Sequence, residues 1–340
     1  MSRKQRKSSV GIALIIMLTC FLIGLVAGML IIHFSGDKGK EQAENLKMTI
    51  SNERKVVNVY VPKRERVFGQ IPKSSYITEN FKIEDGYMTY YDETGNKVSH
   101  LGIDLSYHNG IVDWDKLAES GVEFVMLRCG YRGYTEGGLV KDEKFEEYAA
   151  EANRVGINLG VYFFTQSISV EEAVEEAKFT IDLIKDYDIS YPVALDTEAI
   201  SDKNARTNAA EISDELRSEM AIAFCEKIKE AGYYPMIYSS ENWMRRDMNL
   251  EMLSEYDFWA AQYLEENDFL YDFTMWQYTD EGFVPGIDEA IDLDISMIDY
   301  AEFVPALREA VLSEGEIIEG EGAPGDVVEI TEGYEPIEDN

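Results

Sequence analysis

Residues 191–200 read YPVALDTEAI, and the run from Pro192 to Glu198 decides how the fold is interpreted. An unbroken apolar run that ends in polar residues is typical of a buried strand. Asp196 and Glu198 follow the apolar residues directly. Because residues i and i+2 of a strand face the same side, their carboxylates are expected to project together, with Cα atoms about 6.5–7 Å apart.

Predicted strands and helices alternate on both sides of this stretch. The alternation indicates a parallel α/β fold, and eight strand candidates favour a modified TIM-like (β/α) barrel. An open doubly wound sheet is the alternative, but no glycine fingerprint follows the first strand. The strands are predicted at 101–105, 122–128, 157–164, 192–196, 234–239, 257–263, 272–278 and 290–295, and the helices at 113–119, 142–155, 170–187 and 214–231.

A long apolar segment lies near the N-terminus. Residues 10–32 contain no charge, which is long enough to span a bilayer and too long for the core of a cleavable signal peptide. Four basic residues precede this segment, so the N-terminus is expected to stay in the cytoplasm. The sequence predicts a single-pass membrane protein with a basic tail at 1–9, a transmembrane helix at 10–34 and its globular part outside the cytoplasm.

Four further segments divide the rest of the chain. Residues 35–80 are polar and weakly periodic, which is typical of a stalk. Residues 81–100 predict a β-hairpin lead-in that turns at Thr94-Gly95-Asn96. The barrel is expected at 101–312. Residues 313–340 are rich in acids and contain no Lys or Arg, so they are predicted to form a disordered tail.

The composition excludes several classes of function. The chain holds 31 Lys+Arg and 65 Asp+Glu, a net charge of −34. Nucleic-acid binding is disfavoured, because phosphate contacts need clustered basic residues. Three histidines make a zinc site improbable, and Cys129 and Cys225 are expected to be buried small hydrophobes. We predict no metal and no cofactor.

The predicted strand ends gather carboxylates. Asp104 ends the first strand, Asp196 and Glu198 end the fourth, and Asp292 lies in the last. Catalytic groups of such barrels lie at the C-terminal ends of the strands. One carboxylate raises the pKa of a close neighbour, and a protonated Glu beside an ionised Asp is what acid-assisted glycoside cleavage requires. A helix cap or a solvated loop acid is the bland alternative for the D-x-E pair alone.

Six segments in order carry a family resemblance: GIDLSYHNGIVDW, VEFVMLRCGYRGY, GVYFF, PVALDTE, FWAAQY and MWQYTDEGFVPGIDEAIDLD. From about Gly102 to Ile298 the chain resembles the glycoside hydrolase family 25 lysozymes. The resemblance implies an eight-stranded barrel with about five helices. It also implies N-acetylmuramidase activity, which hydrolyses the β-1,4 bond between N-acetylmuramic acid and N-acetylglucosamine in peptidoglycan glycan strands.

The resemblance also implies roles for individual residues. Glu198 matches the general acid, and Asp196 matches the neighbouring acid that positions the substrate acetamido group. Asp104 and Asp292 match two further cleft aspartates, although Asp294, where the family usually has Asn, is the alternative to Asp292. Net retention through the substrate's own acetamide is implied as well. The substrate-binding residues are expected to be Tyr162, Tyr131, Arg128, Tyr238, Gln262 and Trp276, of which the aromatic ones would stack on sugar faces.

Three other functions remain as alternatives. The first is a non-catalytic glycan-binding or scaffold protein on the same barrel, which the presence of Glu198 and the aspartates disfavours. The second is another polysaccharide hydrolase, such as a chitinase-like enzyme, since D-x-E occurs there too. The third is a divalent-metal hydrolase built on the aspartates, which activity in excess chelator would exclude.

Overall fold

The computed structural model describes residues 56–58, 60–62, 71–264, 268–313, 318–320 and 328–330. They belong to one unit, Val56–Glu332. The predicted transmembrane helix at 10–34 and the basic tail at 1–9 lie outside the described residues, as do most of the stalk and of the acidic tail. Within the described part, no helix combines the length and the apolar character needed to cross a bilayer.

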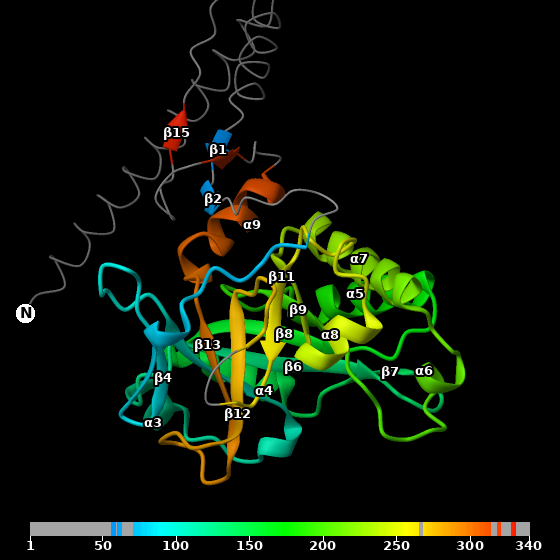
Figure 1. Cartoon of the computed structure of the whole chain (residues 1–340), viewed down its shortest axis with the longest axis horizontal. Coiled ribbons are helices and arrows are strands. Elements are labelled where there is room, and N and C mark those ends of the chain that lie inside the picture. Colours follow the sequence, from blue (N-terminus) through cyan, green and yellow to red (C-terminus); the bar gives the residue numbers. More distant parts are fainter. Residues whose placement is uncertain are drawn as a thin grey trace, which may run out of the picture. The chain divides into compact units, whose positions relative to one another are not determined.

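Eight strands form the predicted closed barrel, in which each strand pairs with the next and the last pairs with the first (Figure 1). Six of its pairings are parallel, and the two made by β13 are antiparallel. In order around the barrel the strands are β5 (His100–Leu105), β6 (Phe124–Arg132), β8 (Asn158–Phe164), β9 (Val193–Asp196), β10 (Pro235–Ser240), β11 (Asp257–Ala261), β12 (Met275–Gly282) and β13 (Ile291–Ser296).

The described residues contain seven α-helices rather than about five, because three short helices add to the longer ones. Serine caps fix the starts of two of the longer helices, α5 and α7. The Ser169 and Ser213 hydroxyls accept hydrogen bonds from the backbone amides of Glu172 and Leu216. Helices α5 and α7 pack against each other. The helices are α3 (Trp114–Glu119), α4 (Phe145–Val155), α5 (Val170–Ile184), α6 (Arg206–Ala209), α7 (Asp214–Glu230), α8 (Glu241–Asp247) and α9 (Val304–Leu312).

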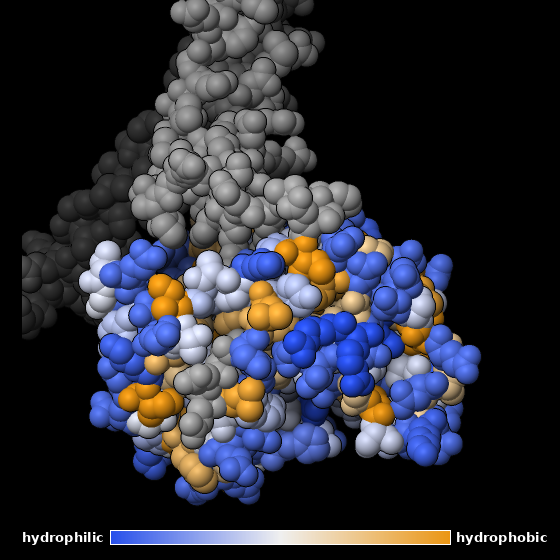
Figure 2. Space-filling model, viewed as in Figure 1, coloured by the Kyte–Doolittle hydropathy of each residue, from blue (hydrophilic) through white to orange (hydrophobic). Residues whose placement is uncertain are grey.

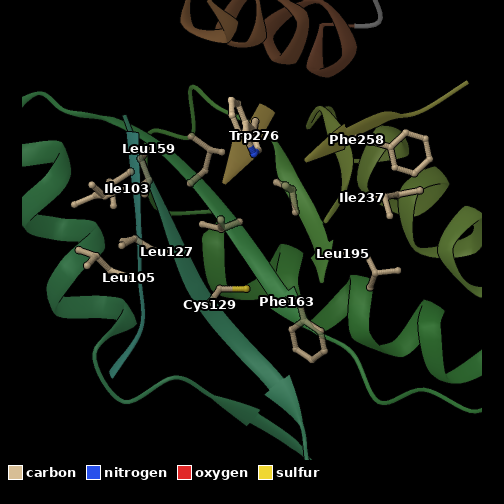
Figure 3. Close-up of a cluster of buried hydrophobic side chains, with 14 of the residues drawn as sticks. Ile103, Leu105, Leu127, Cys129, Leu159, Phe163, Leu195, Ile237, Phe258 and Trp276 are labelled. Atoms are coloured by element: carbon tan, nitrogen blue, oxygen red, sulfur yellow. The ribbon is translucent and has the colours of Figure 1, made fainter. Parts of the chain in front are cut away.

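The outer face of the barrel carries the larger part of the core. Alternate residues of the strands point outward, because successive side chains of a strand face opposite sides. Ile103, Leu127 and Leu195 are among the buried side chains of this layer (Figure 3). Cys129 and Cys225 also lie here, buried and free, as predicted. On the face seen in Figure 2, hydrophilic residues cover most of the surface and hydrophobic ones are scattered.

The inside of the barrel is filled by large side chains that glycines accommodate. Phe124 and Met126 of β6 are fully buried there with Trp259. A Cβ on Gly102 would lie 2.1 Å from the Phe124 ring, and one on Gly160 would lie 2.4 Å from the Met126 sulfur. Because the interior is close-packed, any side chain at these two glycines would displace the filling.

The direction of β13 places its first residues at the functional end of the barrel. We call the end where the seven strands joined by parallel pairings terminate the mouth, and the opposite end the base. Because β13 is antiparallel to β12 and β5, it starts at the mouth and ends at the base, where Ser296 pairs with His100. Asp292, the second residue of β13, therefore lies on the same side as the C-terminal ends of the other strands.

The lead-in differs from the predicted hairpin in its position. Strands β3 (Phe81–Glu84) and β4 (Tyr87–Tyr90) pair across a turn at Asp85-Gly86, where both residues have positive φ. The predicted turn at 94–96 closes only a single bridge, between Tyr91 and Lys97. The Asp92 carboxylate caps that turn by accepting from backbone amides, which explains why the sequence resembled a hairpin there.

The predicted boundaries of the stalk and the tail also differ. Residues 71–80, expected in the stalk, join the barrel: the Ser74 amide donates to the Leu270 carbonyl at 3.1 Å. Within the predicted acidic tail, two segments of three residues form strands with residues 56–58 and 60–62. The pairs are β1 (Val56–Asn58) with β15 (Val328–Ile330), and β2 (Tyr60–Pro62) with β14 (Ile318–Gly320).

Candidate active site

Five acidic residues come together at the mouth and just below it. Asp104 is the penultimate residue of β5, Asp196 is the last residue of β9, and Glu198 follows two residues later. Asp292 and Asp294 come from the start of β13. Burial raises the pKa of Asp104 most, followed by the negative charges of Asp292, Asp294 and Asp196, so these side chains act on one another. The four acids singled out in the sequence are thus neighbours.

A glutamine and two tyrosines fix the carboxylate of Asp104. Gln277 Nε2 donates to Asp104 Oδ2 at 2.7 Å. Gln277 Oε1 in turn accepts from the Tyr238 hydroxyl at 2.8 Å and from the Tyr263 hydroxyl at 2.7 Å. Two donors lock the amide in one orientation, so its Nε2 group always points to Asp104. The chain of bonds leads from the rim of the mouth into the barrel.

Asp292 and Asp294 lie at different depths. Asp294 is fully buried, and its Oδ1 accepts from the Trp259 indole Nε1 at 2.7 Å. Asp292, one pleat nearer the mouth, is partly exposed, and its carboxyl has its pKa raised to about 6 by burial and by the charge of Asp280. Of the two alternatives left open by the sequence, Asp292 is the one a substrate at the mouth can reach.

Asp196 and Glu198 occupy different surroundings although they leave the same strand. Asp196 is 3% exposed, and its Oδ1 has no hydrogen-bond partner among the described residues. Its pKa is raised well above the ordinary value by burial and then by the charge of Glu198, against a lowering by Arg128. Glu198 is exposed at the mouth, and desolvation followed by the charge of Asp292 raises its pKa. Glu198 thus interacts electrostatically with both Asp196 and Asp292.

Arg128 brings one positive charge to this acidic end. Its Nε donates to the buried Asp142 at 2.8 Å, and its guanidinium lies over the rings of Tyr107 and Tyr131, 5.0 and 5.5 Å from their centroids. An irregular register after Arg128 puts Tyr131, rather than Gly130, on the same face. Arg128 is therefore held rigidly near the mouth.

Four of the six predicted substrate-binding residues surround the mouth. Arg128 and Tyr131 do so through the contacts just described. Tyr162, beside Arg128 across β6 and β8, meets the Trp259 ring edge-on with centroids 5.9 Å apart. Tyr238 packs on the same indole at 4.5 Å and pairs with Asp196 across β9 and β10.

The other two predicted residues, Gln262 and Trp276, are placed differently. Met275 and Gln277 of β12 face inward, so Trp276 between them faces outward and is fully buried in the outer core. Its indole Nε1 donates to the Gln262 carbonyl at 2.8 Å. The Gln262 side chain donates to Asp268 and accepts from its amide, which closes a loop. Contrary to the prediction, both residues are placed to support the barrel and not to contact substrate.

Sequence reasoning missed Gln277, which joins Asp104 to Tyr238. Its only signal was the two-residue period of β12, which puts Gln277 and Trp276 on opposite faces. It also missed the role of Asp142, which lies three residues before the first residue of α4 and gave no strand-end signal. Both residues act through neighbours that the sequence did identify.

The sequence comparisons point to one family. Residues 103–287 match the model for glycosyl hydrolases family 25. The chain is 24% identical over 226 residues to the autolytic lysozyme of Clostridium acetobutylicum, covering 66% of this chain and 61% of that protein. It is 25% identical over 215 residues to the uncharacterized protein YegX of Escherichia coli K12, covering 61% of this chain and 74% of YegX.

Solved structures agree with this. The modular autolysin LytC of Streptococcus pneumoniae matches with a TM-score of 0.52 and 27% identity over 64% of this chain and 52% of LytC. The Clostridium perfringens spore cortex lytic enzyme SleM matches with a TM-score of 0.51 and 26% identity over 59% of this chain and 68% of SleM. The chain thus spans about 61% of the autolytic lysozyme and about half of LytC. Since the family match covers more than half of its 340 residues, the chain belongs to glycosyl hydrolases family 25.

Proposed function

We propose that this chain hydrolyses peptidoglycan by cleaving the β-1,4 bond between N-acetylmuramic acid and N-acetylglucosamine. The carrying observation is the pairing of an exposed Glu198, whose pKa is raised, with a buried Asp196 at the barrel mouth. Family membership supports the reaction class. Similarity to an autolytic lysozyme, and to LytC, which has been solved with a synthetic peptidoglycan ligand, supports the substrate.

Glu198 acts in this proposal as the general acid. Its raised pKa lets it hold its proton to a higher pH than an ordinary glutamate does. In the proposed reaction it gives this proton to the glycosidic oxygen as the bond to the leaving sugar breaks. The acetamide carbonyl oxygen of the substrate attacks the anomeric carbon from the other side. Water then opens the resulting ring and returns a proton to Glu198, which gives net retention.

Asp196 orients and stabilises that acetamide. Burial and the charge of Glu198 raise the pKa of Asp196, and the charge of Arg128 opposes them. In this proposal the positive charge that develops on the acetamide draws Asp196 into its ionised form. The buried Asp196 Oδ1, which has no partner among the described residues, would accept a hydrogen bond from the amide N–H of the substrate. Asp104 and Asp292 would shape the charge of the cleavage subsite, and Tyr162, Tyr131, Arg128 and Tyr238 would contact the sugars.

The membrane arrangement is part of the proposal. Residues 10–34 would anchor the chain with its N-terminus in the cytoplasm, and the barrel would face the cell wall. Retention at the membrane would restrict cleavage to the wall nearest the membrane. The basic residues before the apolar segment support this orientation.

Mass spectrometry of products from purified peptidoglycan tests the reaction. New reducing ends on muramic acid are expected, and new reducing ends on glucosamine would point to a different glycosidase and overturn the bond assignment. Cleavage should persist in excess chelator, whereas its loss would favour the metal-dependent alternative. Binding to peptidoglycan with no new reducing ends would favour the non-catalytic glycan-binding alternative.

A further inference from the structure

Two buried carboxyl groups inside the barrel have too few donors between them. Asp294 Oδ1 accepts from Trp259 Nε1 at 2.7 Å, while the buried Asp294 Oδ2 finds no donor among the described residues. Asp104 Oδ2 accepts from Gln277 Nε2 at 2.7 Å. Each carboxylate thus has one N–H donor. An orphaned buried carboxylate oxygen is costly, so the unpartnered oxygen needs an explanation.

The strand register brings the two groups into contact. Asp294 of β13 pairs with Gly102 of β5, and Asp104 lies two residues further along the same face of β5. Diagonal neighbours on one face of a sheet lie about 7–8 Å apart, a gap that two carboxyl side chains extended toward each other can span. Contact with the Asp104 carboxyl, in the form of a hydrogen bond, lowers the pKa of Asp294 against its burial. Two ionised carboxylates offer acceptors only, so this bond requires a proton.

The surroundings offer little positive charge to hold two anions. The charged and titratable side chains around the pair are Arg128, Tyr162, Asp196, Glu198, Tyr238, Tyr263, Tyr278, Asp280 and Asp292. Only Arg128 among them is a cation, and Asp142 already pairs with it. Carboxyl groups in contact at a dry, acidic site keep one proton between them.

We propose that Asp104 and Asp294 share one proton and act as a single monoanion, with Asp294 as the positioning residue of Asp104. The shared proton gives Asp294 Oδ2 a hydrogen bond that neither the Trp259 indole nor the Gln277 amide provides. It also halves the negative charge at the centre of the barrel, below Asp292 and Glu198. Burial raises the pKa of both Asp104 and Asp294 well above the ordinary carboxyl value, in agreement with a retained proton.

Replacing Asp294 by Asn removes the need for the proton. In Asp294→Asn the amide oxygen accepts from Trp259, and the amide N–H donates permanently to Asp104. Wild-type folding takes up a proton that this variant does not, because the pair's pKa in the folded state lies above its unfolded value of about 4. Wild-type stability is therefore lost as pH rises from about 4 toward the folded pKa, and the variant escapes that loss.

The test is denaturant unfolding of the full chain across pH 4.5–8.5. The unfolding constant of wild type relative to Asp294→Asn should rise with pH, by up to about tenfold per pH unit. Asp288→Asn, at an exposed carboxylate, should run parallel to wild type. Asp104→Asn removes the shared proton by replacing the other carboxyl group. Its unfolding constant should therefore differ from that of wild type with the same pH dependence as in Asp294→Asn. Curves of both Asn variants that stay parallel to wild type would overturn the shared proton.

The positioning role rests on the proposed function and has its own readout. Asp294→Leu leaves Asp104 without its partner, so kcat on peptidoglycan should fall by about 10²-fold, with KM little changed, as for a misplaced catalytic group. Asp294→Asn restores the donor and should recover most of the rate. Equal rates for the two variants would refute the positioning role. A wild-type chain that cleaves nothing would refute the proposed function and leave the unfolding result standing.

Discussion

Arg206 forms a bidentate ion pair with Glu172, with Nη1–Oε2 at 2.7 Å and Nη2–Oε1 at 2.6 Å. Its Nη1 also donates to the Gln166 carbonyl at 2.6 Å. Glu172 stands in the first turn of α5, whereas Arg206 lies in the segment that follows Glu198. The pair therefore fastens the chain behind the proposed acid to a helix that the barrel holds in place.

Arg206→Lys should loosen that segment while keeping the charge. A lysine cannot reproduce the planar two-pronged contact, so we expect kcat to fall by about 10- to 10²-fold as Glu198 loses its position. Steady-state kinetics on peptidoglycan check this. Lys203→Ala, at an exposed lysine of the same segment, is the matched control and should cleave like wild type. Full activity of Arg206→Lys would show that Glu198 is held by other contacts.

Glu198→Gln should fold and lose cleavage. The amide keeps the shape of the side chain but has no proton to give to the leaving oxygen. General acid catalysis is worth about 10²–10⁴-fold, and the turnover should drop by that amount. Circular dichroism provides the folding control. A rate above roughly a third of wild type, far outside that range, would remove Glu198 from the acid role.

Two variants should show different effects: Asp196→Asn should lower the turnover, and Asp292→Asn should shift the pH–rate profile. Asp196→Asn removes a charge aimed at the acetamide, so turnover should drop by about 10²–10³-fold. Asp292 raises the pKa of Glu198 by repulsion, so Asp292→Asn should lower that pKa and move the basic limb of the pH–rate profile to lower pH. The difference should appear above about pH 6, where Asp292 is ionised. An unmoved limb in Asp292→Asn would contradict this electrostatic assignment.

Arg132 offers a buried and an exposed ion pair in one side chain. Its Nε donates at 2.7 Å to Glu176, which is fully buried, and its Nη2 lies 3.2 Å from Glu175, which is 60% exposed. Arg132→Met should lower the free energy of unfolding by about 3–5 kcal/mol at pH 8, because it leaves the buried charge of Glu176 unpaired. The loss should shrink at pH 5, where Glu176, with its pKa already raised to about 7 by burial, is protonated.

Glu175→Gln serves as the control for Arg132→Met, since exposed pairs contribute about 0–1 kcal/mol. Urea unfolding of the three proteins at pH 5 and pH 8 provides the comparison. Equal destabilisation by Arg132→Met at both pH values would show that Glu176 carries no charge at pH 8.

Protease accessibility should reveal the orientation across the membrane. The basic cluster before residues 10–32 leads us to expect the barrel outside the cytoplasm. Protease added to intact protoplasts should digest the barrel or the acidic tail, and an antibody against the barrel should detect the loss. Complete protection, with digestion only after lysis, would reverse the orientation.

Much of the barrel follows from local patterns. PVALD becomes β9 because its apolar run has no polar interruption, and the capping serines Ser169 and Ser213 fix the starts of α5 and α7. The carboxylates at the strand ends were found for the same reason, since a barrel brings its strand ends together. These features depend on a few neighbouring residues, which a sequence displays.

The errors arise where pairing decides the outcome. Trp276 and Gln277 are adjacent in sequence, and only the register of β12 sends the indole outward and the amide to Asp104. The irregular register after Arg128 reverses the face of Tyr131 in the same way. The depth of Asp294 depends on β13 running antiparallel, which its sequence does not display. A one-residue shift changes the face of every side chain that follows.

The reversed direction of β13 also determines where the barrel can be tethered. The polypeptide enters the barrel at His100 and leaves it at Ser296, and these residues are partners in one rung of the sheet. An all-parallel barrel of eight strands would release its chain beside the carboxylates instead. Here the segments before His100 and after Ser296 both leave the barrel at the base. An anchor attached to either segment would therefore act from the side opposite the mouth. In the membrane arrangement proposed above, a glycan strand would therefore pass the mouth without meeting the anchored segment.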